Sequence, residues 1–555
     1  PPAMVYAIER PLQNVINGLL RGKDQYAVLR LATIVVLLLR AFRKLRRILN
    51  REGLRAYLVA AAVPYLQMLP PVKAKLKKEM MKTITDMQAK FKEELTCPRT
   101  RLPAEGMPEE ELLELITQRK ELDTKHWADG KITGAVYHGG EDHYALIGQI
   151  YAKWAFANPL HPGIHPALRQ MDSEVVLMVI NMYKGGPDCC GSFTTGGTES
   201  IVMAMKAYRD WGRAVKGITD PNIVVCDTAH AAFDKAGHYF GVFVKKARAM
   251  PATQEVDLQH VARLIDSNTV AIVGSCCQYA HGTIDPIEDL AQIALRQKVG
   301  LHVDCCLGGF LYPFMDKAGF PAPKADFRVP GVTSISCDAH KYGFAPKGSS
   351  VVLFSTRELR RHMYCYITDW TGGIYATATM TGSRAGGPVA ATWAALCKFG
   401  ESGYVETTRQ IVGATRRIAK GIKEMKDLEL VGRSDICVVA FAGTKASKVN
   451  CYAVADCMKQ RFHWDLATCQ NPPCVHLALT LPSSRNADAF LSNLAACVEE
   501  VKADTSGKFA STAGLYGMAA SLPSQFVETG AAAYIDATAD VAAQEGEELP
   551  LKKRG

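Results

Sequence analysis

Short apolar runs alternate with longer helical stretches between residues 190 and 355, and this alternation constrains the possible folds more than any other feature. Each run is brief and mostly apolar, as expected for strands that are buried on both faces of a sheet. The predicted strands are at 223–226, 242–244, 270–275, 301–303, 334–336 and 350–354. We therefore expect an α/β fold built on one large sheet.

Helices are predicted between these strands, at 198–211, 257–267 and 287–297. This order is typical of a large, mostly parallel sheet that is sandwiched by helices. After about residue 400 the pattern changes to a helix at 405–426, followed by short strands and helices. We expect this region to form a smaller C-terminal α+β domain.

A chain of 555 residues is long enough for several domains. Three prolines in 97–108 predict a linker, and the last thirty or so residues, rich in Ala, Glu and Asp, predict a loose tail. The predicted division is an N-terminal segment with linker at 1–108, a large α/β domain at 109–400, the smaller domain at 401–520 and the tail at 521–555.

Residues 26–42 form the most apolar early stretch, but Arg30 and Arg40 interrupt it. Its uninterrupted core is short of the roughly 20 residues that a spanning helix needs, although arginines near its ends can reach the interface. The stretch therefore predicts a helix that either spans a membrane or lies on one. If it spans, the Lys/Arg-rich segment that follows it places the rest of the chain in the cytosol.

The formal net charge is +10, and much of the excess lies in residues 40–55 and 73–92. Aromatic side chains that could stack on bases do not alternate with these basic residues, which disfavours a nucleic-acid partner. A basic run beside an apolar one is more typical of contact with anionic lipid head groups. The seventeen cysteines show no C-x-x-C spacing, so we interpret them as reduced, mostly buried side chains rather than zinc ligands.

Lys341 follows a predicted strand, at the edge of the sheet where ligands collect in such folds. A lysine forms Schiff bases when burial or a nearby cation activates it, and Lys347 could supply that cation or hold an anionic group. A surface lysine after a strand is the plainer alternative. Asp304 also ends an apolar run, where it could pair with the nitrogen of a pyridine ring or simply cap a helix.

Two further segments end strands in the same way. Residues 191–200, GSFTTGGTES, place glycines before Thr198 and a helix, which favours a phosphate cradle. His230 follows the strand at 223–226 and could cover a cofactor ring, although a structural histidine is the commoner case. Phosphate cradle, ring cover, carboxylate and lysine occur in the order typical of fold type I pyridoxal-phosphate enzymes.

Between about residues 110 and 520 the sequence closely resembles the sphingosine-1-phosphate lyase family. The matching segments are NPLHP (158–162), GGPDCCGSFTTGGTES (185–200), AHAAF (229–233), HVDCCLGGF (302–310), VTSISCDAHKYGFAPKGSS (332–350), TDWTGGIYATATMTGSR (368–384) and WAALCKFGESGYVE (393–406). The group II amino-acid decarboxylases share only the general cofactor segments.

The resemblance implies pyridoxal 5'-phosphate as cofactor and a role for each matching residue. Lys341 would carry the cofactor as a Schiff base, Asp304 would face its ring nitrogen and His230 would stack on the ring. Its phosphate would be bound by Gly197, Thr198 and His340, and by Gly382 and Ser383 of a neighbouring subunit. The substrate phosphate and reacting carbon would be met by Tyr137, His161 and Lys347, with Asn158 supporting their loop.

The activity implied is that of a sphinganine-1-phosphate aldolase, an aldehyde-lyase of sphingolipid degradation. It would cleave the C2–C3 bond of a phosphorylated sphingoid base by retro-aldol chemistry, with Lys341, Tyr137 and His161 as candidates for proton transfer. A homodimer with shared sites and a place on the endoplasmic reticulum membrane, facing the cytosol, are also implied. The alternatives are a decarboxylase of the same fold and a non-catalytic membrane scaffold.

Overall fold

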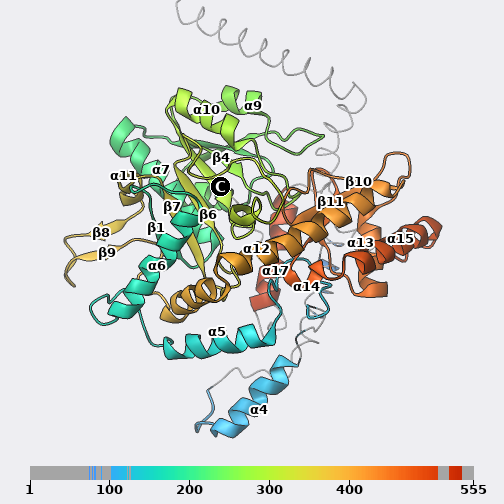
Figure 1. Cartoon of the computed structure of the whole chain (residues 1–555), viewed down its shortest axis with the longest axis horizontal. Helices are drawn as coiled ribbons and strands as arrows, with labels where there is room; N and C mark the ends of the chain where they lie inside the picture. Colours follow the sequence, from blue (N-terminus) through green and yellow to red (C-terminus); the bar gives the residue numbers. More distant parts are fainter. Residues whose placement is uncertain are drawn as a thin grey trace, which may run out of the picture. The chain divides into compact units, whose positions relative to one another are not determined.

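The computed structural model describes residues 102–509, apart from 122 and 124–126, together with 524–539 and six single positions between 74 and 89 (Figure 1). The chain divides into two compact units, residues 108–517 and residues 1–107 with 518–555. The second unit contains the helix α17 (Ser524–Ala539), so part of the predicted tail is helical. The apolar stretch 26–42 lies outside the described residues.

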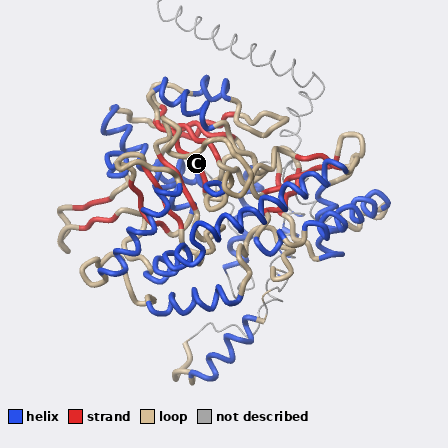
Figure 2. The backbone as a smooth tube through the Cα atoms, in the orientation of Figure 1, coloured by secondary structure: helices blue, strands red, loops and turns tan. Residues whose placement is uncertain are grey.

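A seven-stranded sheet forms the centre of the unit 108–517, in the order β1-β7-β6-β5-β4-β2-β3 (Figure 2). Its strands are β1 (Cys190–Thr194), β2 (Asn222–Cys226), β3 (Phe243–Ala247), β4 (Thr269–Ser275), β5 (Gly300–Cys305), β6 (Ser334–Cys337) and β7 (Ser350–Phe354). Strands β3, β2, β4, β5 and β6 are parallel neighbours, and β7 runs antiparallel to both β6 and β1. The expected mostly parallel sheet is confirmed, with β1 as an additional strand.

Helices cover both faces of this sheet because its strands are apolar on both sides. Val225 and Val352 pack in one core cluster with α7 (Gly197–Lys216) and α8 (Ala232–Phe240). The residues just before them in each strand, Val224 and Val351, point to the opposite face. They pack in the other cluster with α6 (Pro166–Met182), α10 (Ile287–Gln297) and α12 (Gly386–Glu424). The remaining helices before α12 are α4 (Glu109–Lys120), α5 (Glu141–Lys153), α9 (Leu258–Leu264) and α11 (Arg357–Arg361).

A second, antiparallel sheet follows α12, in the order β10-β11-β13-β12. It comprises β10 (Leu428–Leu430), β11 (Val438–Gly443), β12 (Ala467–Cys469) and β13 (Cys474–Ala478), with helices α13 (Cys451–Phe462), α14 (Leu481–Ser484) and α15 (Ala487–Ala503). These elements fit the expected smaller α+β part. The predicted boundary near residue 400 falls inside α12, where Gly400 has φ 54° and interrupts the helical geometry.

A hairpin of β8 (Cys365–Ile367) and β9 (Tyr375–Thr377) projects from the body of this unit (Figure 1). Within the described part of the chain, all helices are too short or too polar to cross a bilayer. The sixteen described cysteines are free thiols, and most are buried, whereas Cys365 and Cys397 are exposed.

Candidate active site

The residues predicted to carry chemistry converge where the parallel strands of the large sheet end. His230 follows β2, Asp304 is the penultimate residue of β5 and Lys341 follows β6. All three line one cavity of about 190 Å³, and Tyr137 contributes to the same wall. His476 and Ala478, which share one face of β13, close the cavity from the small sheet.

Lys341 is held by a carboxylate that we had not predicted. Its Nζ lies 2.9 Å from Oδ2 of Asp338, whose side chain is only 2% exposed. Burial alone would lower the pKa of Lys341, but the Asp338 carboxylate, helped by Cys306 and Tyr137, outweighs burial and raises it. The free lysine is therefore an ammonium in this site at neutral pH.

Asp304 is fixed by two donors at the end of β5. The Cys306 backbone N–H donates to its Oδ1 at 3.0 Å, and the Ser336 hydroxyl on the neighbouring strand β6 donates to the same oxygen at 3.1 Å. The bond to Cys306 closes a local turn after β5, and no helix begins at this point, so Asp304 is not the helix cap that we had considered as an alternative. It does not exclude a ligand, because Asp304 also lines the cavity.

The first turn of α7 begins beside these groups. A Cβ placed on Gly197 would lie 2.6 and 2.7 Å from the two carboxylate oxygens of Asp338, and one on Gly196 would lie 3.6 Å from Cε1 of His340. Thr198 is exposed at the second position of the helix. The free N–H groups and dipole of a helix start attract phosphate, so the predicted cradle lies next to the lysine segment.

Tyr137 lines the cavity, and Lys347 lies over its ring without being part of the cavity wall. The Lys347 ammonium lies 4.8 Å from the centre of the Tyr137 ring, and this ring meets that of Tyr342 edge-on at 4.9 Å. Burial raises the pKa of Tyr137 to about 12, although the nearby Lys341 charge lowers it in part. The phenol therefore keeps its proton at neutral pH.

Several predicted residues are not part of the cavity wall. Four of them, Gly197, Thr198, His340 and Lys347, lie in the segments described above. The others are His161 and Ser383, which are exposed, and Gly382, which is half-buried. Their two segments are nevertheless joined, because the side-chain oxygen of Asn158 accepts bonds from the backbone N–H groups of Leu160 (3.0 Å) and Arg384 (3.1 Å). The predicted supporting role of Asn158 thus has a clear geometric basis.

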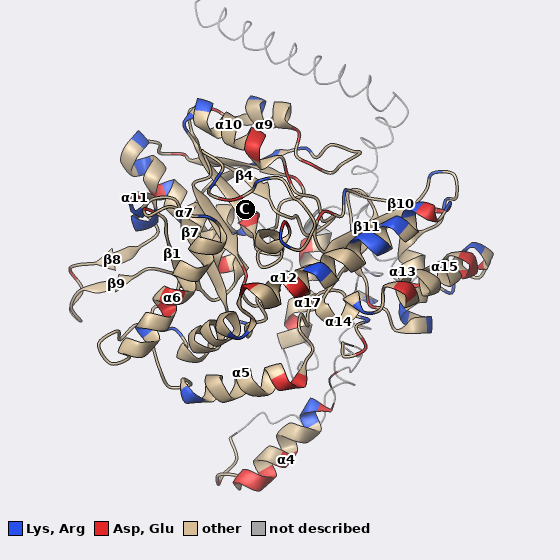
Figure 3. Ribbon diagram, viewed as in Figure 1, with Lys and Arg blue, Asp and Glu red and all other residues tan. Residues whose placement is uncertain are grey.

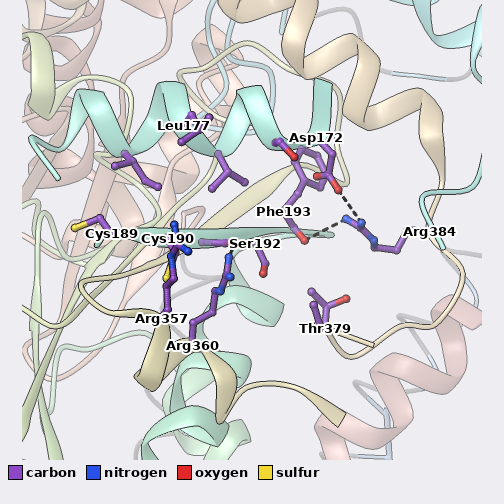
Figure 4. A pocket seen from close by; sticks show the side chains of 15 residues that line it. Asp172, Leu177, Cys189, Cys190, Ser192, Phe193, Arg357, Arg360, Thr379 and Arg384 are labelled. Carbon is purple, nitrogen blue, oxygen red and sulfur yellow. Dashed lines mark hydrogen bonds and ion pairs between the residues drawn. The ribbon is translucent and has the colours of Figure 1, made fainter. Parts of the chain in front are cut away.

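A larger cavity, of about 320 Å³, lies at the outer edge of the sheet between α6, β1 and α11 (Figure 4). Arg384 reaches across one end of it to Asp172 at 2.8 Å, and Arg357 and Arg360 point into the other end. It contains none of the predicted site residues. Chemistry therefore favours the smaller cavity, where a lysine, two carboxylates and a tyrosine meet.

The sequence interpretation missed Asp338, Ser336 and His476. Asp338 had the same signal as Asp304, a carboxylate directly after an apolar strand, and could have been found. Ser336 was treated as part of a strand, and its contact with Asp304 depends on the register of β5 and β6. His476 lies in a different sheet, and its sequence carries no signal for the cavity.

The residues present fit the pyridoxal phosphate that the resemblance implies. The cavity combines an amine, a carboxylate for a ring nitrogen and a nearby helix start for a phosphate. Among the described residues, Nδ1 of His340 and Oδ1 of Asp338 are buried without a hydrogen-bond partner. Buried polar atoms seldom remain unpaired, so this edge of the cavity suits a polar ligand.

Comparison with known proteins agrees with this geometry. Residues 71–443 match the family model of the pyridoxal-dependent decarboxylase conserved domain. The sphingosine-1-phosphate lyase of Drosophila melanogaster is 40% identical over 468 residues, which cover 83% of this chain and 85% of that protein. The Saccharomyces cerevisiae lyase is 42% identical over 427 residues, covering 76% of this chain and 72% of that protein.

Solved structures give the same result. A sphingosine-1-phosphate lyase from Burkholderia pseudomallei superposes with a TM-score of 0.71 at 38% identity, covering 73% of this chain and 94% of that chain. A glutamate decarboxylase from Lactobacillus brevis has a TM-score of 0.64 at 19% identity, covering 74% of this chain and 96% of that chain, and indicates the fold alone.

Proposed function

This chain belongs to the sphingosine-1-phosphate lyase family, and we propose how its residues carry out the reaction of that family. It is a pyridoxal-phosphate-dependent aldehyde-lyase of sphingolipid degradation, which cleaves sphingosine 1-phosphate and related bases to a long-chain aldehyde and phosphoethanolamine. The observation that carries the residue assignments is the convergence of Lys341, Asp304 and His230 on one cavity.

Bound pyridoxal phosphate supplies an electron sink for the pair released when a bond to the amine-bearing carbon breaks. In our proposal Lys341 would hold the cofactor, and Asp304, fixed by Cys306 and Ser336, would keep a proton on its ring nitrogen. His230 would cover the ring. The start of α7, with Gly197 and Thr198, and His340 would hold the phosphate.

The substrate phosphate is assigned to Lys347, Tyr137 and His161. Lys347 is the natural counter-ion, because a phosphate dianion in a partly buried site needs a cation. Its ammonium lies over the ring of Tyr137, and Tyr137 lines the cavity that holds Lys341. An amine at Lys341 and a phosphate at Lys347 would orient the substrate between them.

Cleavage requires one proton to leave the C3 hydroxyl and one to reach C2. With its pKa raised to about 12, Tyr137 is suited to donate a proton rather than to accept one while at rest. Lys341, once free of the cofactor, can also carry a proton. His161, the third candidate, is exposed and lies outside the cavity wall of its own chain.

We propose that the enzyme acts as a homodimer with shared sites. Gly382 and Ser383, which are assigned to the cofactor phosphate of a neighbouring subunit, follow the β8–β9 hairpin in the chain. The adjacent β8–β9 hairpin exposes Tyr366, Trp370 and Ile374, and Asp369 is its one charged residue (Figure 3). Exposed apolar surface of this kind is typical of an interface.

We also propose that the chain is bound to the endoplasmic reticulum membrane through residues 26–42, with the catalytic part in the cytosol. The support is the apolar sequence of that stretch and the basic residues after it. A lipid substrate makes such a position useful, since the substrate is drawn from the bilayer.

The test of the function is incubation of the purified protein with sphingosine 1-phosphate. We expect stoichiometric release of long-chain aldehyde and phosphoethanolamine, measured by mass spectrometry. Glutamate and aromatic amino acids are tested as alternative substrates, because a decarboxylase of the same fold would act on them. Carbon dioxide release from an amino acid, without aldehyde from the lipid, would overturn the assignment.

A further inference from the structure

Asp338 is a buried carboxylate at the reacting nitrogen that has no role in the function proposed above. It follows β6 directly and is three residues before Lys341. Its Oδ2 lies 2.9 Å from Nζ of Lys341 and 3.6 Å from Nε2 of His340. At 2% exposure the carboxylate is shielded from water, so its charge acts strongly on its neighbours.

The position of Asp338 is fixed by close packing. Both carboxylate oxygens approach Gly197, the first residue of α7, so closely that a Cβ there would lie within 2.7 Å of either oxygen. Within the described residues, Oδ1 has no hydrogen-bond partner. A buried carboxylate that is held by a single cation depends on that cation, since loss of the partner leaves a buried charge.

Lys341 is surrounded by titratable groups from several elements, so the contribution of Asp338 has to be separated from theirs. These groups are Asp338, His340 and Lys347 of its own segment, Asp304 and Cys306 at the end of β5, Tyr137 of the segment before α5, His230 after β2, Cys277 and Tyr279 after β4, and His476 of β13. Among these residues, Asp338 forms the ion pair with Lys341.

Asp304, the other carboxylate at this edge of the sheet, has different hydrogen-bond partners and a different proposed role. Its Oδ1 accepts from Cys306 and Ser336, and in the proposed function it faces the ring nitrogen of the cofactor. The two carboxylates lie at the ends of the adjacent strands β5 and β6, because the register pairs Asp304 with Ser336, two residues before Asp338. In this proposal Asp304 faces the cofactor ring, and Asp338 pairs with Lys341.

We propose that Asp338 keeps the Lys341 nitrogen cationic, both as the free amine and when it is bonded to the cofactor. This rests on the proposed role of Lys341 as the cofactor lysine. A cationic nitrogen would favour exchange with the substrate amine. Lys341, freed as an ammonium beside Asp338, would then give C2 the proton that it gains after cleavage. The proton released by the C3 hydroxyl would pass to His161, the remaining candidate for proton transfer, and would leave on the product amine.

The first experiment uses the holoenzyme. The visible band of the bound cofactor changes when the nitrogen bonded to it loses a proton, so a pH titration of the spectrum reports that charge. In Asp338→Asn and Asp338→Ser we expect the transition to move down by at least about one pH unit. Asp326→Asn is the control, because Asp326 is equally buried but pairs with Arg328, at 2.8 Å, instead of with Lys341.

The second experiment removes the cofactor and labels lysines at a series of pH values, with Lys341 followed by peptide mass spectrometry. In Asp338→Asn we expect Lys341 to react at least about tenfold faster at pH 9, because the neutral amine becomes more abundant. The exposed Lys420 serves as an internal reference. This measurement needs no catalysis, so it separates the role of Asp338 from the lyase assignment.

The inference fails if both Asp338 variants keep the wild-type spectral transition and labelling profile. It also fails if neither variant folds while Asp326→Asn does, because Asp338 would then be a structural residue. If Lys341→Ala and the Asp338 variants all kept the visible band, this result would instead contradict the cofactor role of Lys341.

Discussion

Lys341 and Asp338 form a buried ion pair in which each charge reduces the energetic cost of burying the other. A buried ammonium and a buried carboxylate are both costly alone, and a salt bridge at 2.9 Å offsets part of both costs. The same pair gives the reacting nitrogen a defined charge. Stability and chemistry therefore depend on one contact at this site.

Replacing Lys341 by Ala tests both aspects at the residue scale. We expect the visible cofactor band and the lyase activity to disappear, and the free energy of unfolding to fall by about 1–3 kcal/mol because Asp338 loses its partner. Absorbance, product analysis and denaturant unfolding measure the three effects. A variant that keeps the band would contradict the assignment of Lys341.

Tyr137 provides a second test at this scale. Its pKa of about 12 means that the phenol is protonated across the working pH range, so Tyr137→Phe removes a donor. We expect kcat to fall by about 10²-fold with the cofactor band unchanged, and the shape of the pH profile below pH 10 to stay the same. Tyr239→Phe, on the exposed face of α8, is the control. Full activity in Tyr137→Phe would contradict a role in proton transfer.

At the scale of single elements, the start of α7 decides how closely a phosphate can approach Lys341. Gly197 has no side chain, and the space where a Cβ would lie is filled by the Asp338 carboxylate and, at 2.9 Å, by Sγ of Cys306. Glu199 tightens the same turn, since its carboxylate accepts from the Thr195 backbone N–H at 2.6 Å and from that of Met380 at 2.9 Å. The helix start is thus linked to the segment that precedes Gly382.

Gly197→Ala should therefore disturb the cofactor site. The added methyl must displace Asp338 or Cys306, and overpacking of this kind costs about 1–3 kcal/mol. We expect at least about tenfold weaker cofactor binding in an absorbance titration, and a lower melting temperature. Gly186→Ala is the matched control, because no heavy atom would lie within 4 Å of its Cβ. Equal cofactor affinity in the two variants would argue against a tight cradle.

The buried strands were the most predictable elements. Apolar composition located β2, β4, β5, β6 and β7. The predicted ranges 350–354 and 287–297 match β7 and α10 in full.

Two elements were missed. β1 was missed because its sequence, CGSFT, looks like a loop until pairing with β7 buries it. The start of α12 was missed because Gly386, Gly387 and Pro388 resemble a turn. The two glycines leave room for the close approach of Ala157 and Tyr151, which the sequence does not reveal.

At the scale of the whole molecule, the site is assembled from segments that lie far apart in the chain. The order of strand ends predicted that His230, Asp304 and Lys341 would meet, because carboxyl ends of parallel strands share one edge. It could not predict that β13 would bring His476 to the same cavity, since that contact depends on how the two sheets pack. The resemblance supplied Tyr137, which physical patterns alone would not have selected, whereas Lys347 was already a candidate because of its charge and its position six residues after Lys341.

The homodimer is the remaining prediction, and it belongs to this scale. Ile374, 80% exposed on the β8–β9 hairpin, is a suitable position, because a carboxylate there would be buried unpaired if the hairpin docks on a second copy. We expect Ile374→Asp to weaken the dimer by at least about tenfold in sedimentation experiments. Activity should fall together with the dimer fraction, since Gly382 and Ser383 would no longer reach a neighbouring cofactor. Val215→Asp, at a position 54% exposed on α7, controls for added surface charge. A stable, fully active Ile374→Asp dimer would show that the hairpin lies outside the interface, and an active monomer would show that each chain completes its own site.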